Sequence, residues 1–146
     1  MSEFIKSRAR REIFKLKPYV PGKPIEEVKR ELGIKDIIKM ASNENPLGPS
    51  PLAIKAINGV LNDLHLYPDA NCFNLKQKLA ESLDYDVEGI VIGNGSDEIL
   101  KFLAETFINI GDEVIFAEPS FAEYEFTVTI MGAKSIKVPL KDFTHD

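Results

Sequence analysis

A short apolar run passes directly into a glycine-rich turn and then into an amphipathic helix between Ile90 and Leu100. Gly93 and Gly95 can adopt backbone angles that other residues avoid, and the first amide groups of a helix have no intrahelical partners. Those amides and the helix dipole together favour an anion at the helix N-terminus. The segment therefore predicts a strand, a tight turn and a helix that binds a phosphate group at its start.

The same residues also fit an ordinary connection between a strand and a helix. In that interpretation Asn94 or Ser96 caps the helix, while Asp97 and Glu98 complement its dipole. Glu98 stands where the dinucleotide-binding fingerprint requires its third glycine, and no Gly-Lys-Ser/Thr follows to form a nucleoside-triphosphate loop. The turn alone therefore leaves both interpretations open and disfavours dinucleotides and ATP.

Apolar runs alternate with helical patterns in the second part of the chain. Strands are predicted at residues 90–92, 114–117 and 135–138. The four-residue spacing of Leu75, Leu79 and Leu83 predicts one helix. The same spacing of Ile99, Leu103 and Phe107 predicts another, which ends at Gly111. This alternation predicts an α/β fold with a mostly parallel sheet and helices on both faces.

The texture of the chain changes near residue 50. Before this point prolines and glycines interrupt short elements, for which we predict a helix at 24–32 ended by Gly33 and a strand at 36–40. After it the order is regular, beginning with a helix that starts at Ser50 and Pro51. The apolar face of that helix comprises Ile54, Ile57, Leu61 and Leu64.

Three further segments accompany the glycine-rich turn along the chain. They are residues 39–51 (KMASNENPLGPSP), 64–69 (LHLYPD) and 118–124 (EPSFAEY). With the turn, they resemble the N-terminal part of class I/II pyridoxal-phosphate aminotransferases, and most closely the histidinol-phosphate aminotransferase family. The resemblance covers about residues 19 to 138. It implies a fold type I transferase, with 1–49 as the N-terminal arm and part of the small domain and 50–146 as the first, incomplete part of the cofactor-binding large domain.

The resemblance also implies a pyridoxal 5'-phosphate site. The backbone amides of Ser96 and Asp97, beside Gly95, would hold the phosphate. Phe121 would lie on the face of the cofactor ring, where a flat side chain stacks and fixes the tilt of the ring. Tyr67 would reach across a homodimer interface and donate its hydroxyl to the phosphate of the neighbouring subunit's cofactor.

A substrate-binding role is implied for the arm, in which Asn43, Glu44 and Asn45 would lie near the substrate. Each of these segments has a structural alternative when it is taken singly. Phe121 and Tyr124 fit the packed face of a helix, residues 67–69 fit a turn, and residues 43–51 fit a surface loop.

Transamination needs a lysine that forms a Schiff base with the cofactor and moves the substrate proton. The resemblance places that lysine beyond Asp146, together with the aspartate that binds the ring nitrogen and the arginine that binds the substrate carboxylate. The 14 lysines present fit solvated faces, Lys101 included. We therefore expect no catalytic residue in this chain, and we expect the chain to be an N-terminal fragment that is inactive alone.

The reaction implied for the complete enzyme is transfer of an amino group from L-histidinol phosphate to 2-oxoglutarate, which yields imidazole-acetol phosphate and L-glutamate in L-histidine biosynthesis. The alternatives are another class I/II aminotransferase, an enzyme similar to threonine-phosphate decarboxylase, a non-catalytic phosphate-binding module, or one subunit of a split enzyme. The predicted sheet is incomplete, and exposed strand edges favour association and poor solubility.

Composition and the absence of certain patterns argue against some classes of partner and ligand. The net charge of −5 argues against nucleic acid, and 44% hydrophobic residues are typical of a globular protein. The only cysteine is Cys72 and the only histidines are His65 and His145, so the sequence contains no metal-ligand pattern. There is no secretory signal and no apolar run long enough for a membrane span, so we expect a cytoplasmic protein.

Overall fold

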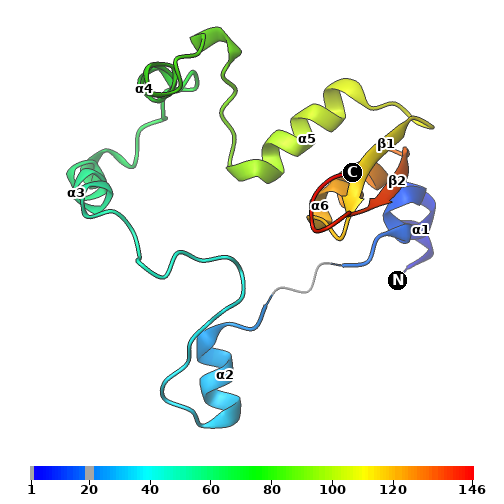
Figure 1. Ribbon diagram of the computed structural model, residues 1–146, viewed down its shortest axis with the longest axis horizontal. Helices are drawn as coiled ribbons and strands as arrows, with labels where there is room; N and C mark the ends of the chain where they lie inside the picture. The colour runs from blue at the N-terminus through cyan, green and yellow to red at the C-terminus, as the bar shows by residue number, and fades with distance from the viewer. Residues whose placement is uncertain (1, 19–21) are drawn as a thin grey trace. The chain divides into compact units, whose positions relative to one another are not determined.

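The computed structural model describes residues 2–18 and 22–146 (Figure 1). Its contacts divide the chain into two compact units. The first unit combines the chain up to Lys17 with Asn71–Asp146, and the second unit is Pro18–Ala70. Each unit is described by itself.

A parallel strand–helix–strand motif forms the centre of the first unit (Figure 1). Strand β1 (Glu113–Glu118) pairs with β2 (Lys134–Pro139), and helix α6 (Ala122–Ile130) connects them. The register places Glu113 opposite Lys134 and Glu118 opposite Pro139. A helical crossover is the usual way for a chain to join two parallel strands. The predicted α/β class with a parallel sheet is therefore confirmed.

Three helical elements lie between residue 71 and this motif in the first unit. They are α4 (Phe73–Leu83), η3 (Val87–Gly89) and α5 (Gly95–Phe107). The N-terminal elements are α1 (Glu3–Arg8) and the 3-10 turn η1 (Arg11–Lys15), which packs against α6. The guanidinium of Arg10 donates a hydrogen bond of 3.1 Å to the carbonyl of Ile130 and so ties the N-terminal segment to the end of α6.

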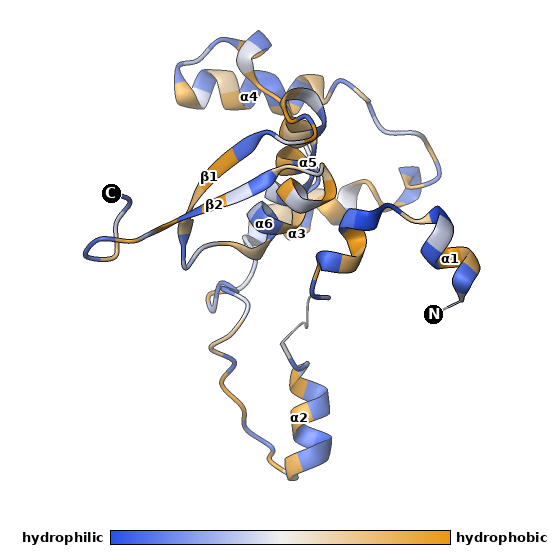
Figure 2. Ribbon diagram, turned by 90° about the vertical axis from the view of Figure 1, so that its right-hand side faces the viewer, coloured by the Kyte–Doolittle hydropathy of each residue, from blue (hydrophilic) through white to orange (hydrophobic). Residues whose placement is uncertain are grey.

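The second unit contains α2 (Ile25–Leu32), α3 (Pro51–Gly59) and the 3-10 turn η2 (Leu61–Asp63). Helix α2 ends where the sequence predicts, because Gly33 adopts the left-handed conformation at φ 66° and donates its amide to the carbonyl of Lys29. Hydrophilic and hydrophobic residues alternate along α2 in Figure 2, as expected for an amphipathic helix. The predicted start of α3 at Ser50 and Pro51 is also confirmed.

Two predicted strands are wrong. Residues 90–92 and 36–40 are not part of any sheet, although Ile90 has an extended backbone at φ −105° and ψ 121°. A strand needs a hydrogen-bonded neighbour, and within residues 2–18 and 22–146 the only sheet consists of β1 and β2. An apolar run therefore produced extended backbone without pairing. The helix predicted up to Gly111 ends earlier, at Phe107, and Gly111 lies at φ 90° in the turn before β1.

The described part of the chain buries little apolar surface. Among these residues only Ala104 of α5 and Val128 of α6 are buried, at 2% and 3% exposure. Large apolar side chains elsewhere remain in water, including Ile38, Met40 and Leu47 at 90% exposure or more. Exposed apolar surface on this scale is typical of regions that contact other protein segments.

An ion-pair cluster joins the three elements of the β1–α6–β2 motif. The ammonium group of Lys137 on β2 lies 3.3 Å from a carboxylate oxygen of Glu118 on β1. It also lies 2.9 Å from a carboxylate oxygen of Glu125 on α6. Both carboxylates favour the charged form of the lysine and raise its pKa above the ordinary value of 10.5, and the largest cause is the hydrogen bond that the ammonium group donates to Glu125.

We predict that Glu125→Gln lowers the pKa of Lys137 towards its ordinary value, because the group that accepts the strongest hydrogen bond of the ammonium group loses its negative charge. A pKa raised in the folded state stabilises the fold at lower pH, and this stabilisation is lost as the pH rises above 10.5 through the folded-state pKa. An NMR titration of the Lys137 side chain measures the change. Glu105→Gln, on α5, is the control. An unchanged Lys137 pKa in Glu125→Gln would contradict the cluster.

Candidate functional site

The glycine-rich turn leads into α5 as the sequence predicts. Gly95 is the first residue of the helix and has a φ of 74°, a left-handed angle that strongly favours glycine. Its amide donates to the carbonyl of Gly93 over 2.9 Å, which closes the turn. A Cβ atom at Gly93 would lie 2.8 Å from Cδ1 of Ile99, so this position also favours glycine. Both glycines therefore fix the path by which the chain enters the helix.

Ser96 and Asp97 follow in the first turn of α5, and both are exposed. Within the described residues, neither backbone amide has a hydrogen-bond partner. Unpaired amides and the dipole at the start of a 13-residue helix such as α5 favour an anion there. The Asp97 carboxylate contributes charge of the opposite sign to the dipole and thus opposes an anion there. Gly95, Ser96 and Asp97 are consecutive and lie together at this helix start, and their role in binding a phosphate stays a prediction.

The helix cap differs from the sequence interpretation. Asn94 occupies the cap position, but its side chain accepts no hydrogen bond from the helix, and Ser96 lies inside the helix. Instead, the Glu98 carboxylate accepts hydrogen bonds from the backbone amide of Asn94 at 2.7 Å and from its side-chain amide at 2.9 Å. Sequence reasoning assigned Glu98 only to the helix dipole and missed this contact. An acidic residue shortly after a cap position is the signal that could have indicated it.

Phe121 lies beyond the carboxyl end of β1, at the position before α6. Its side chain is 48% exposed, so one part of the ring is available to a ligand. The Phe121 ring also packs edge to face against the ring of Tyr124, with ring centroids 6.0 Å apart and an interplanar angle of 89°. Tyr124 also contacts Phe116 of β1 at 6.0 Å. The aromatic residues thus combine packing with an exposed face.

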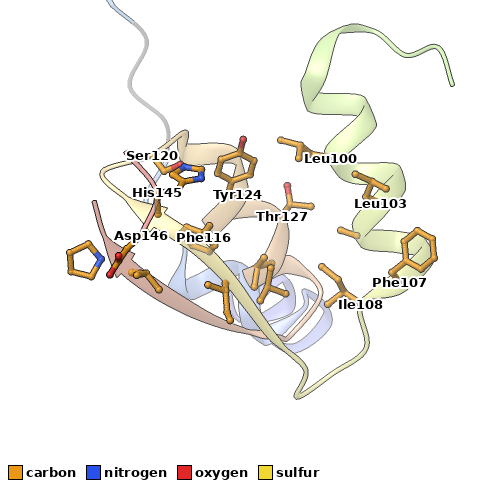
Figure 3. A pocket seen from close by; sticks show the side chains of 17 residues that line it. Leu100, Leu103, Phe107, Ile108, Phe116, Ser120, Tyr124, Thr127, His145 and Asp146 are labelled. Carbon is orange, nitrogen blue, oxygen red and sulfur yellow. The ribbon is translucent and has the colours of Figure 1, made fainter. Parts of the chain in front are cut away.

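Two hollows adjoin these elements. The larger, about 600 Å³, lies among α5, β1 and α6, and Figure 3 shows Leu100, Leu103 and Phe107 of α5 along one side of it. Most of its lining is apolar, and none of the predicted site residues lines it, so we interpret it as an uncovered part of the core. A second hollow of about 370 Å³ is lined by residues of α5 and α6 and includes Asp97 and Glu98.

The remaining predicted site residues belong to the second unit, and the structure does not place them relative to α5. Tyr67 is fully exposed. Asn43 adopts a left-handed backbone at φ 51°, Glu44 pairs with Lys39, and the side chain of Asn45 accepts a 3.0 Å hydrogen bond from the amide of Leu47. Asn45 therefore supports a local turn.

The described residues were also compared with the patterns of a metal site, a membrane span and a solvated helix face. In residues 2–18 and 22–146, no cluster of three or more His, Cys, Asp or Glu side chains has the arrangement of a metal site. None of the helices described there combines the length and the apolar character needed to cross a membrane. Lys101 forms an ion pair with Glu105 at 3.8 Å on an exposed part of α5, as expected for a solvated face.

A family model described as aminotransferase class I and II matches residues 35–146, which is more than half of the chain. The chain belongs to this family. The chain is similar to the histidinol-phosphate aminotransferase of Moorella thermoacetica, with 58% identity over 139 residues. That match covers 95% of this chain and 36% of the relative. The enzyme of the same description from Symbiobacterium thermophilum is 45% identical and is covered to 39%.

Solved aminotransferase structures agree with the fold. Histidinol-phosphate aminotransferase from Sinorhizobium meliloti in complex with pyridoxal-5'-phosphate superimposes with a TM-score of 0.80 and 29% identity, covering 93% of this chain and 36% of that one. The α-aminoadipate aminotransferase LysN from Thermus thermophilus, at 22% identity and a TM-score of 0.54, covers 64% of this chain and 25% of that one and shares the fold. This chain thus spans less than two fifths of the length of the curated relatives it matches.

We predict that Gly95→Ala weakens the start of α5, because a left-handed backbone with a Cβ atom costs about 1 kcal/mol. Amide hydrogen exchange in the second turn of α5 then becomes about fivefold faster, because a loss of about 1 kcal/mol in helix stability changes the opening equilibrium by about that factor. The control is Gly59→Ala at the end of α3, where φ is not positive and no atom lies within 4 Å of the added Cβ. Unchanged exchange in α5 of Gly95→Ala would contradict the strained turn.

Proposed function

We propose that this chain forms the N-terminal part of a pyridoxal-phosphate-dependent histidinol-phosphate transaminase. The complete enzyme transfers the amino group of L-histidinol phosphate to 2-oxoglutarate, giving imidazole-acetol phosphate and L-glutamate, in L-histidine biosynthesis. The observation that carries this proposal is the 58% identity with the Moorella thermoacetica histidinol-phosphate aminotransferase across 95% of the chain. The Sinorhizobium meliloti enzyme, whose structure contains pyridoxal-5'-phosphate, supports it.

The residues at the start of α5 fit a phosphate ester. Two exposed amides, those of Ser96 and Asp97, have no partner within the described chain, and Gly95 presents no side chain that would block an approaching anion. The exposed part of the Phe121 ring fits the flat face of a pyridine. When bound, pyridoxal phosphate supplies an electron sink for the charge that develops at the substrate α-carbon.

Binding and orientation are the tasks that this chain performs. The amides of Ser96 and Asp97 donate hydrogen bonds to phosphate oxygens, and the helix dipole adds a favourable field. The carboxylate of Asp97 opposes the anion, but it is exposed and therefore screened by water. Phe121 limits the tilt of the ring, and Tyr124 supports Phe121 from its edge. Anchoring the phosphate and the ring together restricts the cofactor to one orientation.

The second unit contributes to substrate binding and to a homodimer. Tyr67, fully exposed here, donates its hydroxyl to the phosphate of the cofactor in a neighbouring subunit. Asn43, Glu44 and Asn45 cover the substrate. In domain terms, residues 1–49 form the arm and part of the small domain, and residues 50–146 form the first part of the large domain. We place the enzyme in the cytoplasm, and its substrates are small molecules.

None of the 14 lysines serves as the covalent anchor of the cofactor in this proposal. The lysine that moves the substrate proton, with the partners of the ring nitrogen and the substrate carboxylate, comes from residues outside this sequence. This chain alone therefore catalyses no transamination.

A chimera tests the proposed reaction. In it, this chain replaces the matched segment, 36% of the Moorella thermoacetica relative. We predict that the chimera restores growth without histidine to a strain that lacks histidinol-phosphate aminotransferase, and that the 146-residue chain alone does not. Purified chimera exchanges amino groups between L-histidinol phosphate and 2-oxoglutarate. A folded chimera that binds pyridoxal phosphate without exchanging these substrates would contradict the proposal.

A second prediction separates the ring contact from the phosphate contact. Phe121→Ala in the chimera weakens pyridoxal phosphate binding about fivefold, because a stacked aromatic pair contributes about 1 kcal/mol. Phe121→Tyr, which keeps the ring, is the matched control and retains the affinity. Equilibrium dialysis with pyridoxal phosphate and with inorganic phosphate measures both effects, and inorganic phosphate binding stays unchanged in Phe121→Ala. Equal losses for the two ligands would show that Phe121 acts on the fold rather than on the ring.

A further inference from the structure

Glu98 accepts two hydrogen bonds from the cap residue at the start of α5. One oxygen of its carboxylate, Oε2, accepts hydrogen bonds from both donors of Asn94, the backbone amide at 2.7 Å and the side-chain amide at 2.9 Å. The same oxygen lies 3.4 Å from the position that a Cβ atom would take at Gly93. Glu98 is half-buried, whereas residues 94–97 are exposed. The carboxylate therefore lies on the inner side of the turn.

This contact occupies one of the amides at the start of the helix. The amide of Gly95 is used by the carbonyl of Gly93, and the amide of Asn94 is used by Glu98. The amides of Ser96 and Asp97 are not used in this way, and both residues are exposed. A carboxylate is favoured near the N-terminus of a helix, so a glutamate side chain that was not held at Asn94 would compete with a phosphate for the amides of Ser96 and Asp97. Holding the Glu98 carboxylate at Asn94 prevents this competition.

We propose that Glu98 is a positioning residue for the phosphate site: its carboxylate fixes Asn94 and the turn so that the amides of Ser96 and Asp97 stay free and correctly directed. The ligand is the phosphate monoester of pyridoxal phosphate, so this inference rests on the proposed function. Glu98 acts through Asn94 and does not touch the ligand.

Positioning and charge have opposite effects on affinity. A carboxylate near a phosphate dianion repels it, so a purely electrostatic role predicts tighter binding when Glu98 is neutralised or removed. A positioning role predicts weaker binding when the hydrogen-bond acceptor is removed. It also predicts that glutamine, whose amide oxygen still accepts from the Asn94 backbone amide, retains most of the affinity.

The experiment measures equilibrium binding of pyridoxal phosphate and of inorganic phosphate to the chimera in which this chain replaces the matched segment of the Moorella thermoacetica relative. Its variants are Glu98→Ala, Glu98→Gln and Ser96→Pro, with Glu105→Ala as the control on the exposed face of α5. We expect Glu98→Ala to weaken binding of both ligands about fivefold, the effect of one lost hydrogen-bonded support, and Glu98→Gln to stay within about twofold. Amide exchange at Asn94 becomes faster in Glu98→Ala, while Glu105→Ala changes neither measurement.

The outcomes separate this inference from the proposed function. If Ser96→Pro weakens binding while Glu98→Ala binds as tightly as the unchanged chain or more tightly, the phosphate site stands and the positioning role is overturned. If Ser96→Pro leaves binding of both ligands unchanged, the phosphate is not held at α5, and the proposed function and this inference fail together. If Glu98→Ala disrupts folding, Glu98→Gln decides, and a fivefold loss in that variant overturns the proposal.

Discussion

The two unpartnered amides at the start of α5 are the feature on which the functional interpretation depends. A helix leaves its first amides without intrahelical acceptors, and water, side chains or a ligand must satisfy them. In the described part of this chain Gly93 and Glu98 satisfy the amides of Gly95 and Asn94, whereas the amides of Ser96 and Asp97 have no such partner. A phosphate group satisfies two adjacent donors at once and gains from the helix dipole, which is why a short turn can determine what the chain binds.

The β1–α6–β2 motif positions Phe121, the residue proposed to contact the cofactor ring. The parallel pair directs β1 so that its carboxyl end is followed by Phe121, and ligands of open α/β sheets bind beyond the carboxyl ends of strands. The ion pairs of Lys137 join β1, α6 and β2 at this same end. The sheet and the charge cluster thus support the position of an aromatic ring that keeps about half of its surface exposed.

Local patterns predicted much of the fold. The predicted bounds of β1 and β2 lie one residue inside the observed ones at each end, because apolar runs bounded by turns identify strands well. Gly33 ends α2 as expected, since its left-handed angle is a local property. Residues 90–92 and 36–40 were wrongly predicted as strands because pairing depends on a neighbour that the apolar pattern of a segment does not specify. Among the site residues, Glu98 was missed for a related reason. Its role depends on a side-chain geometry that spacing alone does not reveal.

The central claim is that the amides of Ser96 and Asp97 bind the phosphate of pyridoxal phosphate. The most direct test is to record the amide NMR signals of Ser96 and Asp97 in the chimera with the Moorella thermoacetica relative while pyridoxal phosphate is added, and then to repeat the titration with pyridoxal, which lacks the phosphate. The account predicts saturable shifts of the Ser96 and Asp97 signals with pyridoxal phosphate, and none with pyridoxal at the same concentration. Equal shifts with both compounds, or no shift at these two residues with pyridoxal phosphate, would contradict it.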